Sequence, residues 1–311
     1  MNSSRTHRVK WVLLMAALVP AFLCSCATGK WGYIDRSGNM VIVPGYDEAT
    51  SFAEGLAAVR VDTGWGYIDQ KGSIVLPPRF QEAWRFAEGM AAVMSGGKWG
   101  YIDRSGEFVI APQFDDALSF SEGLAPVRIK DHWGFINHLG HVVVAARFDE
   151  ARPFSESLSA VKVENRWGYV DRDGRFVIEA RYERALPFSE GVAAVMETGK
   201  WGFIDSKGST VLPFRFDMIL SFADGMAAVK IVEHWGYIDR MGKLMIEPQF
   251  EQGSSFDGGL APVRIGGKWG YVDKTGHLVI TPTFDVAYPF NEGLALVRLG
   301  RPVGYVDKTR R

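Results

Sequence analysis

The stretch WGYIDRSGEFVIAPQFDDALSFSEGLAPVRIKDH, residues 99–132, decides the fold, because similar versions of it follow one another along the chain. Trp-Gly recurs every 34 residues without an insertion, and Val303-Gly304 stands at the next expected place. A fixed period of this length indicates a stack or ring of small units, none of which can bury its own apolar face. Eight full units cover residues 31–302: 31–64, 65–98, 99–132, 133–166, 167–200, 201–234, 235–268 and 269–302.

The repeated residues predict strands rather than helices. With each Trp as place 1, Gly stands at place 8, Phe at place 22 and Val at place 29 in all eight units. Tetratricopeptide repeats share the 34-residue period, but Gly at places 2, 8 and 25 and, usually, Pro at place 14 would interrupt both of their helices. The stretches between are β-branched and aromatic, so we expect an all-β fold.

Three strands are expected in each unit. In residues 99–103, alternation puts Trp99 and Tyr101 on one face and Ile102 on the other. Residues 103–106 begin with Asp and end with Gly, which predicts a hairpin with a type I turn and a bulge. The second strand follows at residues 108–110 and is expected to stop at Pro112. After a loop, the third strand is expected at residues 124–128.

The array of eight three-stranded meanders has two possible forms. In an open β-solenoid-like array, the end strands would act as caps. In a propeller-like ring, a strand from the C-terminal end would complete the first unit. Because 34 residues are few for a four-stranded blade, three strands are expected in either form. Residues 303–311 are expected to form a partial ninth repeat and a C-terminal cap.

The first 25 residues predict an export signal. Arg5, Arg8 and Lys10 precede an apolar stretch at residues 11–23, which is typical of a secretory signal peptide. The following Leu23-Cys24-Ser25-Cys26 resembles a bacterial lipobox, so Cys26 is expected to carry a lipid, with residues 26–30 as the lipidated N-terminal cysteine and a short spacer. An ordinary cleaved signal, with incidental cysteines, is the alternative.

The net charge and the cysteine content limit which kinds of partner are expected. The net charge is −1, and removal of residues 1–25 discards three basic residues and no acidic one, leaving −4. This balance disfavours a nucleic-acid partner and a polybasic membrane contact, so the lipid is expected to be the membrane anchor. No cysteine follows Cys26, so stability must come from packing rather than disulfides. By resemblance to lipoprotein sorting, an Asp directly after the lipidated cysteine retains a protein at the inner membrane. Position 27 holds Ala instead, so the outer membrane is expected if the host has two membranes.

Several motifs resemble the bacterial WG (KWG) repeat family, whose members include lipoproteins. They are residues 98–103 (KWGYID), the Pro112-x-Phe114-Asp115 stretch, and residues 120–125 (FSEGLA). The resemblance covers residues 30–311. It implies an exported or surface-exposed β-repeat protein of the cell envelope, and the family mostly has no assigned activity. The departures from the motif are Asn137, Ala146 and Ser157 in repeat four, Ile219 in repeat six and Gly258 in repeat seven.

The repeated columns are interpreted mainly as structural. The tryptophans suit either an aromatic ladder in the core or stacking on sugar rings, and core packing is favoured. The Phe column, from Phe52 to Phe290, is assigned to the core. The Asp column, from Asp35 to Asp307, is expected to cap turns, because a calcium loop needs several oxygen ligands within about a dozen residues. The tryptophan column is Trp31, Trp65, Trp99, Trp133, Trp167, Trp201, Trp235 and Trp269.

Catalytic and metal-binding signals are weak. His132, His138 and His141 cluster in repeat four, but no cysteine and no HExxH motif accompanies them. They are interpreted as exposed turn residues. We therefore expect no enzymatic activity, cofactor or metal.

Recognition is expected where the units differ from one another. The leading hypothesis is a non-catalytic, lipid-anchored envelope protein that presents a surface to another macromolecule, most simply a protein. The alternatives are a cell-wall glycan-binding module and an envelope hydrolase with its site in repeat four. The candidate binding surface consists of Arg79, Arg147, Arg181, Arg215, Trp84, Arg85, Arg152 and Tyr288.

Overall fold

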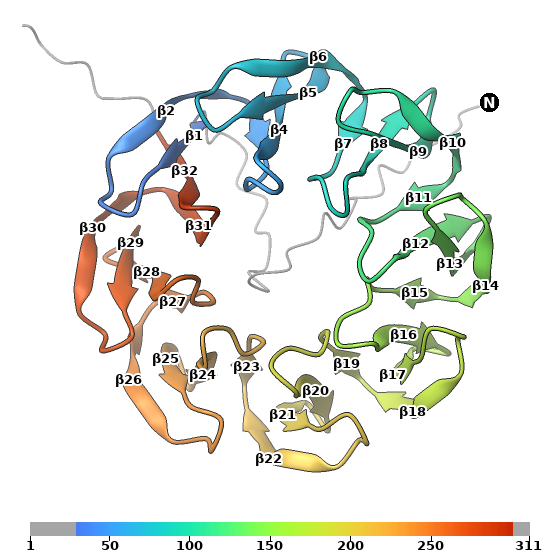
Figure 1. Cartoon of the computed structure of the whole chain (residues 1–311). Coiled ribbons are helices and arrows are strands. Elements are labelled where there is room, and N and C mark those ends of the chain that lie inside the picture. Colours follow the sequence, from blue (N-terminus) through green and yellow to red (C-terminus); the bar gives the residue numbers. More distant parts are fainter. Residues whose placement is uncertain (1–28, 301–311) are drawn as a thin grey trace, which may run out of the picture.

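The computed structural model describes residues 29–300, which form a closed ring of eight four-stranded antiparallel sheets (Figure 1). The expected signal peptide, the expected lipid site Cys26 and the expected partial repeat at 303–311 lie outside the described residues. The ring form of the sequence prediction is therefore confirmed, and the fold is an eight-bladed β-propeller. The described residues contain no helix long and apolar enough to cross a membrane.

Each blade contains an inner, a second, a third and an outer strand. Blade 1 is β3 (Glu48–Ala49), β4 (Leu56–Val61), β5 (Gly64–Asp69) and β6 (Ile74–Phe80). Blade 2 is β7 (Glu82–Ala83), β8 (Ala91–Ser95), β9 (Lys98–Ile102) and β10 (Phe108–Phe114). Blade 3 is β11 (Asp116–Ala117), β12 (Leu124–Ile129), β13 (His132–Asn137) and β14 (Val142–Phe148). Blade 4 is β15 (Glu150–Ala151), β16 (Ser159–Val163), β17 (Arg166–Val170) and β18 (Phe176–Tyr182).

The other half of the ring repeats this order. Blade 5 is β19 (Arg184–Ala185), β20 (Ala193–Glu197), β21 (Lys200–Ile204) and β22 (Thr210–Phe216). Blade 6 is β23 (Met218–Ile219), β24 (Ala227–Ile231), β25 (His234–Ile238) and β26 (Leu244–Phe250). Blade 7 is β27 (Gln252–Gly253), β28 (Leu260–Ile265), β29 (Lys268–Asp273) and β30 (Leu278–Phe284). Blade 8 is β31 (Val286–Asn291), β32 (Leu294–Leu299), β1 (Lys30–Ile34) and β2 (Met40–Tyr46).

Blade 8 closes the ring by joining the two ends of the described chain. Its strand order is β2-β1-β32-β31, and β1 pairs antiparallel with β32 from Lys30↔Leu299 to Ile34↔Ala295. Each 34-residue unit therefore supplies the third and outer strands of one blade and the first two strands of the next. This offset ties neighbouring blades together covalently and removes the need for end caps.

Two details of the predicted meander are wrong. A fourth, inner strand of two residues, such as β11, lies in the segment expected to be a loop. It is too short to produce an alternating pattern. In addition, β10 runs through Pro112 to Phe114 rather than stopping at the proline. Proline is tolerated there because β10 is the outer strand, whose outward edge pairs with nothing in the blade.

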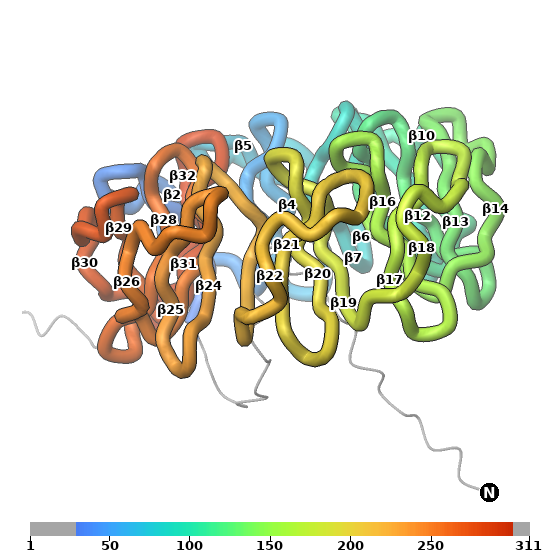
Figure 2. The backbone as a smooth tube through the Cα atoms, turned by 90° about the horizontal axis from the view of Figure 1, so that it is seen from below, coloured from blue at the N-terminus to red at the C-terminus, as the bar shows by residue number. Residues whose placement is uncertain are grey.

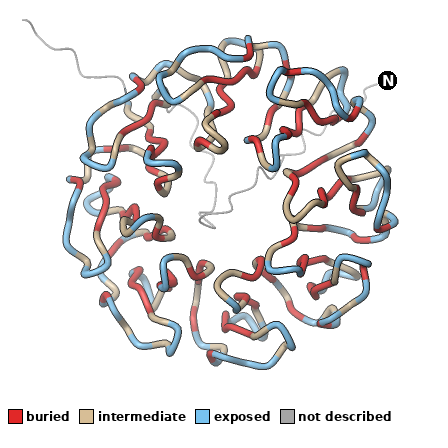
Figure 3. The backbone as a smooth tube through the Cα atoms, viewed as in Figure 1, coloured by how far each residue is buried: buried red, intermediate tan, exposed pale blue. Residues whose placement is uncertain are grey.

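The core lies between blades, where unlike faces meet. Trp99, Tyr101 and Phe114 of blade 2 pack against Phe120 and Val127 of blade 3. The other face of blade 2 turns Ile102 toward blade 1. Figure 3 shows the resulting burial of the inner and middle strands and the exposure of the outer wall. The predicted division of Trp99 and Tyr101 from Ile102 is confirmed.

An aromatic pair recurs at every junction between blades. Tyr101 and Phe120 have ring centroids 4.8 Å apart, and the Tyr101 hydroxyl donates a hydrogen bond of 2.8 Å to the Leu118 carbonyl of blade 3. The same ring pair occurs at all eight junctions, with centroid distances of 4.7–4.9 Å. Burial raises the pKa of Tyr101 well above its ordinary value, so this hydroxyl stays protonated and remains a donor.

The turns define two faces of the ring, which is seen from the side in Figure 2. The face that we call the turn face carries the hairpins between inner and second strands and those between third and outer strands. In the latter, Gly106 has φ of 89° and donates to the Asp103 carbonyl, while the Asp103 amide donates to the Glu107 carbonyl. The predicted type I turn with a bulge is confirmed. The opposite face, which we call the linker face, carries the connections between blades.

The glycine after each tryptophan permits a close backbone approach between third and outer strands. A Cβ on Gly100 would lie 2.6 Å from the Ile110 carbonyl oxygen and 2.7 Å from the Pro112 nitrogen. Both atoms belong to the backbone of β10, next to a register shift in the β9/β10 pairing. Any side chain at this place would therefore push the outer strand away.

Replacing Gly100 with Ala should destabilise the ring by about 2 kcal/mol, because the outer strand of blade 2 must move to avoid overpacking. The midpoint of thermal unfolding, followed by circular dichroism, should fall accordingly. Gly45→Ala is the matched control, since the nearest heavy atom to its Cβ would be 3.8 Å away. Equal losses in the two variants would contradict this account of the Trp-Gly motif.

Candidate functional site

The predicted binding residues do not form one surface. Trp84, Arg85, Arg152 and Tyr288 lie at or just after the inner strands of blades 2, 4 and 8. Arg79, Arg147, Arg181 and Arg215 lie on the outer strands of blades 1, 3, 4 and 5. The structure therefore separates the predicted surface into two regions, which we call the inner rim and the outer wall.

Three of the inner-rim residues contact the repeated tryptophans. The Trp84 ring lies 6.0 Å from the Trp99 ring at 14°, and its indole N–H donates to the Ala117 carbonyl at 3.1 Å. The Arg152 guanidinium lies 4.9 Å from the Trp167 ring centroid. Tyr288 contacts Trp31 with centroids 5.7 Å apart. These large groups fill the space between blades and are only partly exposed.

Arg85 differs from these three because its side chain is exposed. The other blades carry Ser or Pro at the same place, as in Ser119 of blade 3 and Pro153 of blade 4. Arg85 therefore places one long cation at the inner rim next to the partly buried Trp84.

The inner strands give the rim two chemically different halves. Their first residues are acidic in four consecutive blades and not in the other four. Glu48 contacts Arg60 at 2.7 Å and Glu150 contacts Lys162 at 2.9 Å, each from the second strand of its own blade. Burial raises the pKa of Glu48, and the neighbouring Glu82 adds to this shift while Arg60 opposes it. In blade order, the residues are Glu48, Glu82, Asp116 and Glu150, then Arg184, Met218, Gln252 and Val286.

The arginines of the outer wall link neighbouring blades. Arg79 donates to the Gly106 carbonyl of blade 2 at 2.5 Å, and Arg147 donates to the Gly174 carbonyl of blade 4 at 2.5 Å. Each guanidinium also lies over the ring of the following residue, 5.0 Å from Phe80 and 5.1 Å from Phe148. Arg181 and Arg215 make the same kinds of contact at 3.2 and 3.4 Å. These side chains remain exposed while bridging two blades.

The tryptophan column is part of the core, as predicted. Trp65, Trp99, Trp167, Trp201, Trp235 and Trp269 have only 2–7% of their surface exposed, and Trp31 and Trp133 are intermediate. Stacking of sugar rings on the six buried indoles is therefore excluded. The Phe column, at most 2% exposed throughout, is also in the core, as predicted.

A repeated glutamate at place 24 has a role that the sequence did not reveal. We call it the Glu column, and it consists of Glu54, Glu88, Glu122, Glu156, Glu190 and Glu292. Glu88 and the following glycine have positive φ, and its carboxylate accepts a hydrogen bond of 3.0 Å from the Gly123 amide of the next blade. The same contact joins Glu54 to Gly89 and Glu292 to Gly55. These glutamates, each just before a turn glycine, therefore link successive blades on the turn face. The repeated Glu-Gly pair was the available signal, although the partner 35 residues away was not.

A second unrecognised column pairs Lys at the start of a third strand with the Asp that follows the outer strand of the same blade. Lys98 contacts Asp115 at 2.6 Å. This contact lowers the pKa of Asp115, with the hydrogen bond from Lys98 as the main cause. The regular separation of 17 residues in the sequence is the signal for it. The other described pairs are Lys30–Asp47, Lys200–Asp217 and Lys268–Asp285.

The histidines of repeat four do not converge on one site. His132 begins β13, whereas His138 and His141 lie beyond its other end. His138 stacks on Phe120 with centroids 4.5 Å apart, and its Nε2 lies 2.9 Å from a Glu88 carboxylate oxygen. Among the described residues, no group of three His, Cys, Asp or Glu side chains is arranged to hold a metal ion.

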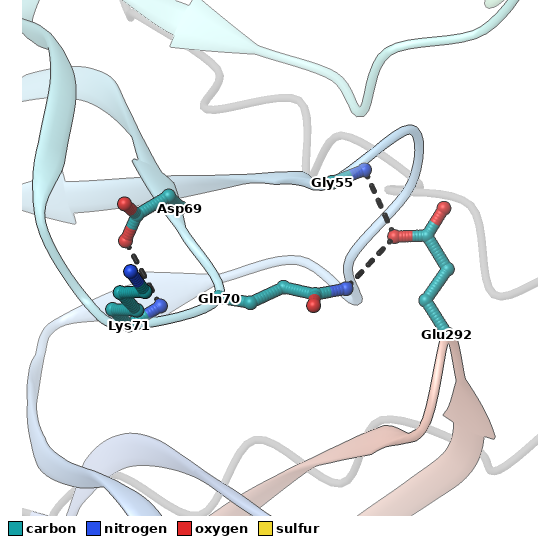
Figure 4. Close-up of a pocket in the computed structure, with 5 residues that line it drawn as sticks. All are labelled: Gly55, Asp69, Gln70, Lys71 and Glu292. Atoms are coloured by element: carbon teal, nitrogen blue, oxygen red, sulfur yellow. Dashed lines mark hydrogen bonds between the residues drawn. The ribbon is translucent and has the colours of Figure 1, made fainter.

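The depression between blades 8 and 1 on the turn face is shallow and open, with a volume of about 480 Å³ (Figure 4). The Glu292 carboxylate lies at its edge and accepts hydrogen bonds from the Gly55 amide at 2.9 Å and the Gln70 side chain at 3.4 Å. Its carboxylate is therefore committed to the contact between blades. Asp69, which also lines the depression, is engaged in its own turn.

The Asp column caps turns, as predicted. Asp103 accepts hydrogen bonds from the amides of Ser105 at 2.9 Å and Glu107 at 3.1 Å, and Asn137 makes the equivalent contacts in blade 3. The Ser105 hydroxyl is the main cause of a lowered pKa at Asp103, followed by these amides. Asp35, Asp69, Asp205 and Asp273 also have lowered pKa values from hydrogen bonds within their turns.

These shifts predict a dependence of stability on pH. Because the folded-state pKa lies below the unfolded value, the stabilisation is present at neutral pH and is lost as pH falls through the folded pKa, from about pH 5 downward. Replacing Asp35, Asp69, Asp103, Asp205 and Asp273 together with Asn should keep the turns and flatten the fall in the unfolding midpoint between pH 6 and 3. Parallel curves for wild type and variant would contradict this role.

Comparison with known proteins supports the repeat assignment. The family described as WG containing repeat matches residues 31–62, 65–99, 99–131, 133–167, 167–201, 201–231, 235–269 and 269–301. No curated protein matches the chain significantly.

Solved structures resemble the fold at low sequence identity. The crystal structure of a eukaryotic initiation factor covers 84% of this chain and 86% of its own, with 10% identity and a TM-score of 0.52. Dihydro-heme d1 dehydrogenase NirN covers 80% and 72%, with 10% identity and a TM-score of 0.49. Hsv2p of Kluyveromyces lactis covers 62% and 74%, with 10% identity and a TM-score of 0.45. At these identities the similarity concerns the fold alone.

Proposed function

Because the chain belongs to the WG-repeat family, we propose that it is a non-catalytic binding scaffold of the bacterial envelope, anchored by a lipid on Cys26. The observation that carries this proposal is the division of the blades into a repeated framework and a variable inner rim. The Trp, Tyr, Phe, Asp and Glu columns are engaged in turns or in contacts between blades. Recognition is therefore assigned to places where blades differ.

The inner rim is the proposed contact surface, and its partner is a macromolecule, most simply an envelope protein. Its acidic half spans blades 1–4 and is followed by four blades without acids at that place. Trp84 and Arg85 add a flat aromatic group and an exposed cation to the acidic half. Such a spread of mixed charges around aromatic groups suits a large polar partner better than a small substrate, which needs an enclosed pocket.

The anchoring part rests on the sequence of residues 1–26. Labelled palmitate should enter the wild-type protein in its bacterial host and should not enter Cys26→Ala. Cys24→Ala is the matched control and should be labelled like the wild type. Equal labelling of Cys26→Ala and wild type would remove the lipid anchor from the proposal.

The binding part is tested by placing a photo-crosslinking amino acid at Arg85 and, as the control, at Lys207 on the turn face. Illumination of intact cells should give a discrete higher-mass adduct from position 85 and not from position 207. Adding Glu82→Lys to the protein that carries the crosslinker at position 85 should reduce the yield of its adduct several-fold, because this change reverses a charge of the acidic half. Adducts of equal yield from both positions would contradict recognition at the inner rim.

A further inference from the structure

The outer strands give the ring eight edges. In every blade the outer strand ends the sheet, so one side of its backbone has no partner strand within the blade. Unpaired N–H and C=O groups on such an edge form a template for another strand. Proteins commonly protect edges with proline, which removes a donor, or with a charged side chain.

Six of the eight described outer strands contain proline. Of the two that do not, β18 contains the exposed acid Glu179, whereas β14 contains no acid. The prolines are Pro44 in β2, Pro77 and Pro78 in β6, Pro112 in β10, Pro213 in β22, Pro248 in β26 and Pro282 in β30.

Strand β14 has no proline and no acidic residue, and its one charged side chain is Arg147. Its sequence is VVVAARF, and Ala146 stands where five other blades have proline. Those five prolines show that the blade does not require an N–H at this place. The Ala146 amide is therefore a donor that the blade itself does not need. Val142 and Val143 at the start of the same strand are 52% and 46% exposed, which gives β14 an apolar surface.

The wall around β14 is basic. Arg147 is the only charged residue of the strand, and Arg181 and Arg215 occupy the same place on the next two blades. The Arg147 side chain donates to the Gly174 carbonyl, which leaves most of its five N–H groups available. The exposed acids Asp149, just after β14, and Glu179, in β18, offset part of this positive charge.

We propose that the outer edge of β14 is a docking site for an extended acidic peptide segment of a partner protein. The peptide would add as a fifth strand to blade 3, with backbone hydrogen bonds to β14 and acidic side chains near Arg147. Backbone pairing supplies affinity, and the arginine charge selects for acid. This site lies on the outer wall and does not depend on the inner rim proposed above.

The test measures binding of a fluorescein-labelled peptide of eight alternating Glu and Val residues to the full chain by fluorescence polarisation. Ala146→Pro should weaken binding at least tenfold, since it removes the central donor. Ala180→Pro is the matched control, because it makes the same change at the same place in β18, and it should leave affinity unchanged within twofold. Arg147→Gln should weaken binding several-fold and reduce its dependence on salt.

Both proline substitutions reproduce a residue found at this place in other blades, and thermal unfolding checks that each variant folds. If Ala146→Pro does not fold, Val143→Lys blocks the same edge with an exposed charge, and it should weaken binding comparably. The proposal is overturned if the peptide does not bind, if Ala146→Pro and Ala180→Pro bind alike, or if a Lys-Val peptide binds equally well. A concentration-dependent dimer in sedimentation that Ala146→Pro abolishes would instead identify a second copy of the chain as the occupant.

Discussion

The burial of one blade's Trp and Tyr face by the Phe, Val and Ala face of the next is the interaction on which the ring depends. A single blade is a thin sheet with two apolar faces, and it has no core of its own. Any open stack would leave one face of each end blade in water. Closure through the pairing of β1 with β32 covers both of these end faces. Tyr33 of blade 8 then packs against Phe52 of blade 1, as Tyr101 of blade 2 packs against Phe120 of blade 3.

Three repeated polar contacts follow the same rule, since their partners also lie in the next blade. The Tyr101 hydroxyl reaches the Leu118 carbonyl, Glu88 accepts from the Gly123 amide, and Arg147 donates to the Gly174 carbonyl. A residue type can therefore recur every 34 residues for purely structural reasons, even when it is charged and exposed. The two proposed recognition surfaces therefore use groups that escape this repetition, at the inner rim and along an outer edge.

The sequence predicted what is local and missed what depends on distant pairing. The Asp103–Gly106 turn and the burial of Trp99 follow from short patterns. Ring closure does not, because β1 and β32 pair across almost the whole chain and nothing in their local pattern specifies the partner. Pro112 was misread as a strand end because its tolerance depends on β10 being outermost. The periodic arginines were recognised, but their separation from Trp84 and Arg85 depends on which strand faces the ring axis.

The departures from the repeat fall into two classes with different meanings. Asn137 and Ser157 preserve contacts, since the Asn side chain still caps its turn and the Ser157 amide still donates to Glu122. Gly258 removes the acidic side chain that the other repeats carry at its place, and Ala146 removes the proline ring that five other blades carry at its place. At Gly258 a Cβ would lie 1.9 Å from the Arg36 guanidinium, which instead donates to the Gly258 carbonyl at 2.6 Å. That seam lacks the carboxylate and keeps an arginine contact found at other seams, as from Arg104 to the Glu54 carbonyl at 2.7 Å. Ala146 restores a backbone donor where five other blades have proline, which is why the docking site proposed above lies on blade 3.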